Sequence, residues 1–388
     1  MPYNPPMEGK IPRYMQAALL AGPRRIRVME VPVPRPRPGE ALVRIRAVGI
    51  CRSDIHYYQT GRIGDQVIRK WPQALGHEAA GEVWQAPRDA RGIRAGDRVA
   101  VEPATPCGRC IQCRSGRGNI CTRVKFLGMP GNPGAFAEFI AIRLENLVKF
   151  PPRAAFEEGV ALEPMAIGLH AVRLAKGGRD LRSAFPRAGG TFGPPFQGRA
   201  RPSVRLFGAR IPEAAVVGTG PVGLAVLAAL RAEFRSRVTA FDFISYRLRV
   251  ARIMGAAGRV RVNRGFSAAR TALLAGRKWN YVFEAGGTEE AVELAIELAA
   301  PGGTVALIGI HDRARTPVNL HMARRKELVL LNVRRSNDEL GECVRLVASG
   351  KLDLSPMISH RGGLEEAARF FAMAEKYRDG VIKAVINP

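Results

Sequence analysis

Two short stretches of the chain carry the residue types that bind a catalytic metal ion. Cys51 stands in the first, and His77 followed by Glu78 stands in the second. A thiolate, an imidazole and a carboxylate suit a catalytic zinc site when the fourth position stays open. Each stretch follows a strand-like run and a loop glycine, Gly49 or Gly76, and loops on a strand scaffold often carry sites. A buried free cysteine and a core histidine are the alternative, which this shared loop setting makes the weaker interpretation.

A second group of cysteines lies within one glycine-rich loop. The four are Cys107, Cys110, Cys113 and Cys121. Two residues separate each of the first three from the next, and seven residues separate Cys113 from Cys121. Four thiolates at such spacing can close the tetrahedral sulfur cage of a structural zinc site. The alternative is four reduced cysteines without a metal ion. The two groups together predict two zinc ions per chain.

A glycine fingerprint begins at Gly218 and continues through Gly220 to Gly223. An apolar strand-like run precedes it and a helix-like run follows, which is the context that a dinucleotide site requires. These glycines permit a tight turn, close approach of a pyrophosphate and close packing of helix on strand. Asp242 ends the next strand-like run, where a carboxylate can bind the adenosine ribose hydroxyls. We therefore predict an NAD site.

The elements that must position these residues fall into two groups. Short strands separated by Gly and Pro occupy 15–50, 75–103 and 134–150, and this pattern predicts a closed β-domain. The run Ala161–Pro164 is expected to open a helix through Ala171, with Pro164 in its first turn.

From Glu213 onward, strand-like and helix-like runs alternate, which predicts a doubly wound parallel sheet and an α/β fold class. After about residue 337 the chain is expected to return to the first domain. The stretch 176–212 is rich in Gly, Pro and Arg and is assigned neither structure nor function.

Three motifs lie between Val48 and Gly81: His56-Tyr57-Tyr58, Gly61-Arg62-Ile63-Gly64-Asp65 and Leu75-Gly76-His77-Glu78-Ala79. On these motifs the sequence resembles the zinc-dependent medium-chain dehydrogenases, and within them the sorbitol/xylitol (polyol) branch. The resemblance extends from about Met15 to the C-terminus, apart from 176–212.

The resemblance implies a domain organisation. A GroES-like β-barrel catalytic domain would comprise 15–165 and 337–388, with a structural-zinc lobe at about 103–125. A Rossmann domain that binds NAD would comprise 166–336 and contain the 176–212 insertion.

The resemblance also implies an activity, the zinc- and NAD-dependent interconversion of a polyol and a ketose. Cys51, His77 and Glu78 would hold the catalytic zinc, although Glu163 could exchange roles with Glu78. Ser53 and His56 would carry the hydroxyl proton outward, and hydride would pass to the nicotinamide.

Further residues are assigned by the same resemblance. Those expected to contact substrate are Tyr57, Glu163 and Arg335, with Arg334 as a possible replacement for Arg335. Those expected to bind the cofactor are Gly218, Gly220, Val222, Gly223, Asp242, Arg247, Ile308, Gly309, Ile310 and Val333.

Composition limits the possible partners. The chain of 388 residues has a net charge of +26, but its basic residues are scattered and form no run with interleaved aromatics. We therefore expect a small-molecule substrate and neither a specific nucleic-acid partner nor a membrane span. The cysteine pattern favours a reducing, cytoplasmic location. A homodimer or homotetramer is expected, paired through the strand near Leu307–Ile310.

Two other functions remain open. The chain could be another zinc medium-chain dehydrogenase, acting on L-threonine, glucose or a simple alcohol. It could also be a homologue that binds NAD and zinc but is catalytically impaired.

Overall fold

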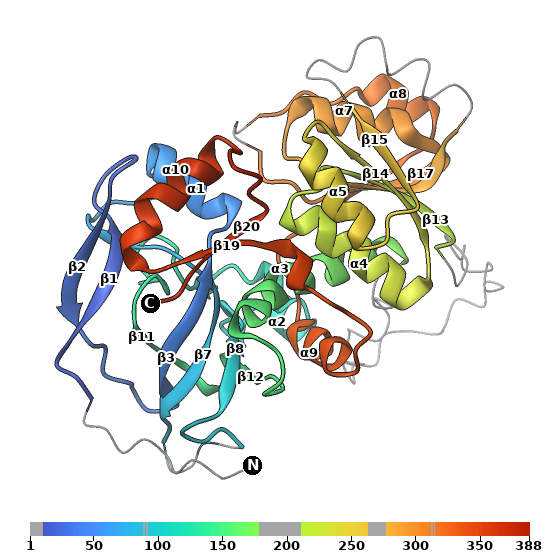
Figure 1. Ribbon diagram of the computed structural model, residues 1–388. Helices are drawn as coiled ribbons and strands as arrows, with labels where there is room; N and C mark the ends of the chain where they lie inside the picture. The colour runs from blue at the N-terminus through green and yellow to red at the C-terminus, as the bar shows by residue number, and fades with distance from the viewer. Residues whose placement is uncertain are drawn as a thin grey trace, which may run out of the picture.

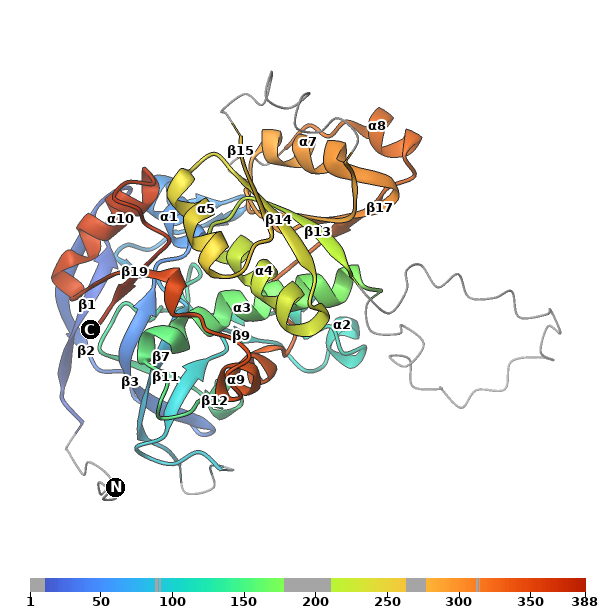
Figure 2. The same cartoon turned by 45° about the vertical axis from the view of Figure 1, so that its right-hand side comes forward.

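The computed structural model describes residues 11–87, 90, 92–177, 211–262, 277–311, 313 and 315–388. Most of the expected N-terminal extension and nearly all of the 176–212 stretch lie outside these residues. Figures 1 and 2 show a strand-rich half, which holds the described N-terminal strands and the C-terminal strand, beside a second half built on a separate sheet.

The strand-rich half is organised around one mixed sheet. Its order is β12-β8-β7-β3-β20-β19, with β11 also pairing with β3. The strands are β3 (Glu40–Gly49), β7 (Glu78–Gln85), β8 (Arg98–Val101), β11 (Phe139–Arg143), β12 (Leu147–Lys149), β19 (Ile358–Gly362) and β20 (Lys383–Ile386). Because β3 pairs with β7, β11 and β20, it is buried along nearly its whole length, and the metal-ligand candidates lie at its end.

Smaller elements complete this half. A second sheet has the order β2-β1-β6, formed by β1 (Tyr14–Leu20), β2 (Ile26–Pro32) and β6 (Gln73–Ala74). The two-stranded pairs are β4 (Arg62–Ile63) with β5 (Gln66–Val67), and β9 (Ala104–Thr105) with β10 (Lys125–Phe126). The helices are α1 (Arg52–Thr60), α2 (Ile111–Arg114), α9 (Leu340–Ala348) and α10 (Ala367–Glu375). The short 3-10 turns are Gly118–Ile120, Leu144–Asn146, Ser355–Met357 and Leu364–Glu366.

The second half contains the parallel doubly wound sheet that the alternating pattern predicted. Its order is β15-β14-β13-β16-β17-β18. The strands are β13 (Glu213–Val217), β14 (Arg237–Asp242), β15 (Gly258–Arg261), β16 (Trp279–Glu284), β17 (Ala299–Leu307) and β18 (Val329–Asn332). The described helices are α4 (Pro221–Phe234), α5 (Ser245–Ile253), α7 (Glu289–Leu298) and α8 (Leu320–Arg325). The strand order changes direction between β13 and β16, which is where such sheets bind dinucleotides.

The predicted pairing strand is wrong. β17 contains Leu307 and pairs with β16 on one side and β18 on the other, so neither of its edges is available to a second chain. The strand that ends this side of the described sheet is β18. The apolar run up to Ile308 marks a buried strand, and burial of this kind is typical of an internal strand rather than an edge.

The helix α3 (Phe156–Ala175) connects the two halves, and it begins earlier than predicted. Pro164 therefore lies inside the helix rather than in its first turn, because the true N-cap is Ala155. The missing N–H of Pro164 leaves the carbonyl of Val160 without its helical donor, which favours a local distortion beside Glu163. α3 packs against α4 of the second half and β7 of the first. A Cβ on Gly168 would lie 2.6 Å from a backbone atom of Ala225, so only glycine allows this approach.

The close approach of α3 to α4 gives a test of the packing between the two halves. Gly168→Ala should lower the free energy of unfolding by about 1–3 kcal/mol, because the new methyl group meets the α4 backbone. The matched change Gly341→Ala in α9 should raise it by up to about 1 kcal/mol, because its nearest neighbour is a flexible Arg345 side chain at 3.9 Å. Urea unfolding measures the free energy of unfolding of both variants. Equal changes in the two variants would contradict the close packing of α3 on α4.

Candidate active site

The first metal-ligand group assembles where β3 and β7 lie side by side. Cys51 follows β3 and is the N-cap of α1, and Glu78 opens β7 opposite Gly49. One donor atom from each of Cys51, His77 and Glu78 lies within 4.8 Å of the others. A Cβ on Gly49 would lie 2.3 Å from Glu78 Oε2, so the glycine leaves room for the carboxylate. The donor set is the one that a catalytic zinc ion takes.

Asp54 fixes the orientation of the two loops, and the sequence analysis did not identify it. Its carboxylate, 1% exposed, accepts hydrogen bonds from the backbone N–H of Cys51 (2.9 Å) and of Gly76 (3.1 Å). It also lies 3.5 Å from His77 Nδ1, which leaves Nε2 for a metal ion. Burial alone lowers the pKa of His77, but Asp54 and Cys51 raise it well above its usual value. The surroundings thus favour a cation at this imidazole. In the sequence, Asp54 stands three residues after the helix N-cap Cys51, which is the spacing of a capping box and could have identified it.

Lys383 is the second residue that the sequence analysis missed. Its Nζ lies 2.6 and 2.5 Å from the two Glu78 oxygens and donates to the carbonyl of Ile50 at 3.1 Å. Both charged side chains are 1% exposed. Burial lowers the pKa of Lys383, but the Glu78 carboxylate outweighs it, so the net shift is upward. A carboxylate has lone pairs for an ammonium group and a metal ion together, so this pairing leaves Glu78 able to act as a ligand.

Glu163 lies on α3 and approaches the same site from another side. It is 4% exposed, and its Oε2 is buried without a hydrogen-bond partner. Burial raises the pKa of Glu163 to about 8, while His77 lowers it and Glu78 raises it. This oxygen therefore lacks a partner, and a metal ion, a water or a substrate hydroxyl can supply it. Among the described residues, Glu78 and not Glu163 belongs to the close ligand group.

The remaining reaction candidates lie on α1. Ser53 Oγ is 3.5 Å from His77 Nε2, and His56 is buried one turn further along the helix. Tyr57 donates a hydrogen bond to Gln66 Oε1 at 3.1 Å, and burial raises the pKa of Tyr57 to about 12. Its phenol therefore stays protonated and polar at the site.

The structure distinguishes the two arginines that the sequence left as alternatives. Arg335 is half-buried, with its guanidinium 4.7 Å from the centre of the Phe126 ring. That ring lies 5.2 Å from the ring of His77. Burial, followed by the charge of Arg334, lowers the pKa of Arg335 to about 10. Arg334 is exposed, although its charge also reaches Tyr57.

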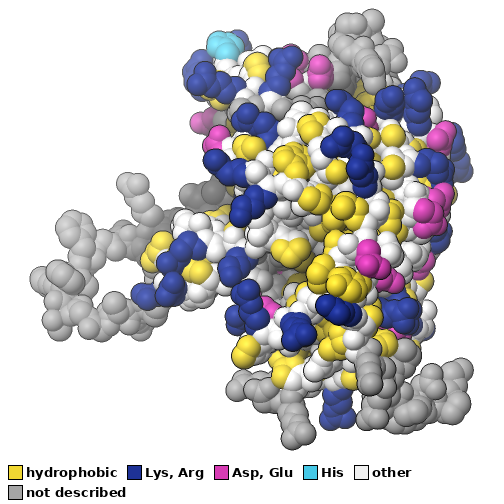
Figure 3. Space-filling model, turned by 90° about the vertical axis from the view of Figure 1, so that its left-hand side faces the viewer, with side chains coloured by type: hydrophobic (Ala, Val, Ile, Leu, Met, Phe, Trp, Pro, Cys, Tyr) yellow, Lys and Arg dark blue, Asp and Glu magenta, His cyan; other side chains and the backbone are white. Residues whose placement is uncertain are grey.

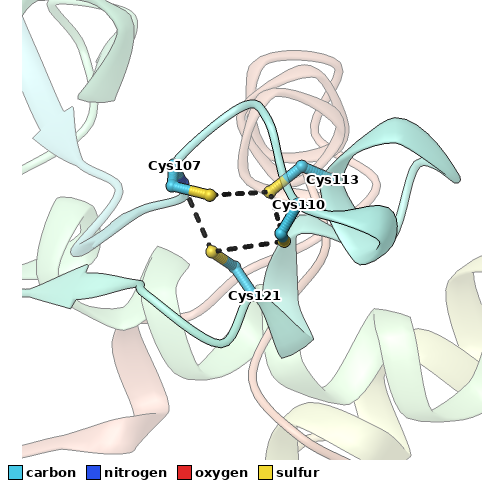
Figure 4. Close-up of side chains that lie close together, drawn as sticks. All are labelled: Cys107, Cys110, Cys113 and Cys121. Carbon is cyan, nitrogen blue, oxygen red and sulfur yellow. Dashed lines mark hydrogen bonds between the residues drawn. The ribbon is translucent and has the colours of Figure 1, made fainter.

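The four cysteines of the second group face one another from a single loop (Figure 4). Three sulfur–sulfur distances are 3.4 Å (Cys110–Cys113), 3.8 Å (Cys110–Cys121) and 4.0 Å (Cys107–Cys113). A tetrahedron with zinc–sulfur bonds of about 2.3 Å has edges of about 3.8 Å, so the arrangement fits a zinc ion. Among the described residues, the group consists of these four cysteines, and four thiolates fill a tetrahedral site, which favours a structural role.

The glycine fingerprint forms the turn between β13 and α4. Gly218 has φ +89°, and a Cβ there would lie 2.6 Å from the backbone of Gly286. A Cβ on Gly223 would lie 1.8 Å from the carbonyl oxygen of Gly218. At Gly220 a Cβ would meet only the Arg247 guanidinium, 3.5 Å away. The packing of the protein itself therefore requires glycine at 218 and 223, whereas Gly220 leaves space for a ligand.

Asp242 closes this turn at the end of β14. Its Oδ2 accepts from the N–H (2.7 Å) and the hydroxyl (2.9 Å) of Thr219, and its Oδ1 accepts from the N–H of Ile244 (2.8 Å). Arg247 stacks on Tyr377 at 4.7 Å. The other cofactor candidates lie on α4 or after β17 and β18, around the carboxyl edge of the sheet: Val222, Ile308, Gly309, Ile310 and Val333. The fold therefore collects all the proposed cofactor residues at one edge.

Comparison with known proteins identifies the family. Residues 37–152 match the alcohol dehydrogenase GroES-like domain family, and residues 221–349 match the zinc-binding dehydrogenase family. Sorbitol dehydrogenase from Bos taurus is 31% identical over 92% of this chain and 91% of its own length. The chain belongs to the zinc-dependent medium-chain dehydrogenases, in their polyol branch.

Two further relatives agree with this family assignment. L-idonate 5-dehydrogenase from Vitis vinifera is 29% identical over 89% of this chain and 87% of its own length. The structure of a zinc-binding dehydrogenase from Sinorhizobium meliloti bound to NADP superimposes with a TM-score of 0.80 at 25% identity, covering 97% of this chain and 99% of that one. The GroES-like and Rossmann folds predicted from the sequence are therefore both confirmed. Among the described residues, no helix has the length and apolarity needed to cross a bilayer.

The two ligand groups of this medium-chain dehydrogenase predict different responses to mutation. Metal analysis of the purified protein should find two zinc ions per chain. Cys51→Ser should abolish turnover and leave the protein folded with its cage zinc, whereas Cys110→Ser should lower Tm because a structural site contributes folding energy. One zinc per chain in the unmodified protein would contradict one of the two sites.

The buried pair of Lys383 and Glu78 gives a second test. In protein freed of zinc, Lys383→Met should lower the free energy of unfolding by about 3–5 kcal/mol, because the buried Glu78 carboxylate then has neither the ammonium group nor a metal ion beside it. The double variant Glu78→Gln/Lys383→Met should recover much of that loss, because it removes both charges. Chemical denaturation measures both variants, and a double variant less stable than Lys383→Met would overturn the pairing.

Proposed function

We propose that the protein is a zinc- and NAD-dependent dehydrogenase that interconverts a polyol of the sorbitol or xylitol type and its ketose. The observation that carries this proposal is the polar character of the surroundings of the Cys51–His77–Glu78 group. Tyr57, Glu163 and Arg335 are all wholly or partly buried. Burying an unpaired hydroxyl costs about 1–3 kcal/mol, so a substrate with several hydroxyls needs such partners. A simple alcohol would need an apolar slot instead.

Each residue has a proposed part in the reaction. Cys51, His77 and Glu78 would hold the zinc ion, which when bound makes a hydroxyl group more acidic. Ser53, beside His77 Nε2, would take the hydroxyl proton and pass it toward His56 on the same face of α1. Glu163, with its unpaired buried oxygen, would position a substrate hydroxyl or a water.

We also propose NAD as the cofactor and a pairing of chains through β18. Asp242 places a carboxylate near the expected ribose and would repel a 2′-phosphate. β18 ends the sheet, and none of the described strands pairs with its outer edge, which supports a homodimer or a homotetramer built from dimers. The six cysteines form no disulfide, which supports a reducing, cytoplasmic location.

The substrate remains a small molecule in this proposal despite the net charge of +26. Figure 3 shows the face that carries β1 and β2, where Lys and Arg side chains are spread among apolar and acidic ones. Exposed β2 side chains include Val28 and Met29. The described side chains of this face form no continuous basic stripe of the kind that nucleic-acid binding favours.

A second candidate substrate is a polyol that carries a carboxylate. The charges of Arg334 and Arg335 both lower the pKa of Tyr57, and Arg335 stacks on Phe126, whose ring contacts that of His77. Guanidinium groups bind carboxylates well. The L-idonate 5-dehydrogenase of Vitis vinifera among the relatives makes a sugar acid a concrete alternative.

A substrate panel tests the proposed function. Oxidation of xylitol or sorbitol should be far more efficient than oxidation of ethanol or L-threonine, measured as kcat/KM from NADH formation. Arg335→Ala should raise the polyol KM about tenfold or more, with zinc content and NAD affinity unchanged. The matched control Arg334→Ala, at an exposed position, should change the KM much less. Better use of ethanol or L-threonine would contradict the polyol proposal, and better use of L-idonate would favour the second candidate.

Cofactor choice is tested at Asp242. The protein should use NAD with a higher kcat/KM than NADP, because the carboxylate repels a 2′-phosphate. Asp242→Ala should bring the kcat/KM for NADP closer to that for NAD. Asp242→Glu keeps the charge and should therefore retain more of the preference for NAD. Equal use of both cofactors by the unmodified protein would show that Asp242 does not select the cofactor.

A further inference from the structure

The segment between β18 and α9 carries Arg335 and has an unusual backbone. Two of its non-glycine residues adopt left-handed conformations, Arg335 with φ 56° and Asp338 with φ 76°. This region is disfavoured for residues with a side chain, so contacts from outside the segment must hold it.

Those contacts come from the four-cysteine loop, far away in the sequence. The side-chain amide of Asn119 donates to the backbone carbonyl of Arg334 at 2.9 Å, and the backbone carbonyl of Asn119 accepts from the Arg335 guanidinium at 3.3 Å. The side chain of Asn337 accepts from the N–H of Asn119 at 3.4 Å and donates to the carbonyl of Gly116 at 2.9 Å. These four hydrogen bonds, which we call the asparagine clasp, join the two segments from both sides.

One end of the clasp is fixed by the cysteine cage. Asn119 lies in the 3-10 turn Gly118–Ile120, immediately before Ile120 and Cys121. Its side chain also lies 3.5 Å from His170 Nε2, and His170 Nδ1 lies 3.0 Å from Glu339. Glu339 in turn accepts from the N–H of Asn337. The contacts from Asn119 through His170 and Glu339 to Asn337 therefore close a ring with the clasp.

The other end of the clasp lies beside the active site. Arg335 stacks on Phe126, and Phe126 contacts the ring of His77. The second terminal nitrogen of Arg335 lies 3.7 Å from the sulfur of Met129. Phe126 and Met129 carry no charge that would hold the guanidinium, so its direction depends on the clasp, which holds the backbone at Arg334 and accepts directly from the guanidinium at Asn119.

We infer that Asn119 and Asn337 are positioning residues through which the four-cysteine lobe sets substrate affinity, by holding Arg335 toward the substrate. The inference rests on the proposed function, in which Arg335 contacts substrate. It gives the lobe a role beyond stability: the cage orders Asn119, Asn119 and Asn337 order the backbone at Arg334 and Arg335, and that backbone directs the guanidinium.

The test is the double variant Asn119→Ala/Asn337→Ala in the zinc-loaded enzyme. The polyol KM should rise about tenfold, with kcat and the KM for NAD changed less than about twofold and two zinc ions retained. Hydrogen exchange of the amides in 333–338 should accelerate, whereas exchange in β1 should not. The matched control is Arg114→Ala, an exposed residue of the same lobe, which should change none of these quantities.

Two results would overturn the inference. Unchanged exchange in 333–338 would show that the clasp does not hold the segment, and faster exchange with an unchanged KM would show that the held segment does not set affinity. If the double variant does not fold, Asn337→Ala alone removes two of the four hydrogen bonds and should raise the KM about threefold. If the unmodified protein prefers a substrate without several hydroxyls, the proposed function fails. The same comparison with that substrate, together with the exchange data, still decides the inference.

Discussion

The buried ion pair between Lys383 and Glu78 is the constraint on which the active site depends. A carboxylate with almost no exposure needs a compensating charge, and Lys383 supplies it through both oxygens. The lysine comes from β20 near the C-terminus, and the glutamate opens β7, so the pair fixes the end of the chain against β3. Gly49 leaves room for the carboxylate. The last strand is therefore part of the metal site as well as of the sheet.

The two zinc-ligand groups are linked through the substrate side of the site. The cage orders the loop that contains Asn119, and the segment that contains Arg335 lies between that loop and Phe126. α3 contributes His170 to this contact and places Glu163 beside the catalytic ligand group, and it packs against α4 beneath the cofactor turn. Cofactor, metal and substrate residues are thus positioned by a few shared elements.

The sequence predicted those parts of the structure whose signals are local. The cysteine spacing, the pair His77–Glu78 and the glycine turn each lie within a few residues, and their contexts predicted both folds. Lys383 was not predicted because its partner lies 305 positions away, although a single lysine in the apolar run of β20 was a signal. The start of α3 was missed because its N-cap, Ala155, offers no capping side chain. The pairing strand was misplaced because the resemblance that suggested it does not tell which strand ends the sheet.

Anomalous diffraction at the zinc absorption edge, on crystals of the zinc-loaded protein, tests the central claim most directly. The account predicts two peaks per chain. One should lie among the four cysteine sulfurs, and the other should have Cys51 sulfur at about 2.3 Å, a His77 nitrogen at about 2.0–2.1 Å and a Glu78 oxygen at about 2.0–2.2 Å, with Lys383 still on that carboxylate. A second peak that contacts Glu163 while Glu78 remains bound only to Lys383 would contradict the ligand set proposed here. Absence of a peak at Cys51 would contradict the site itself.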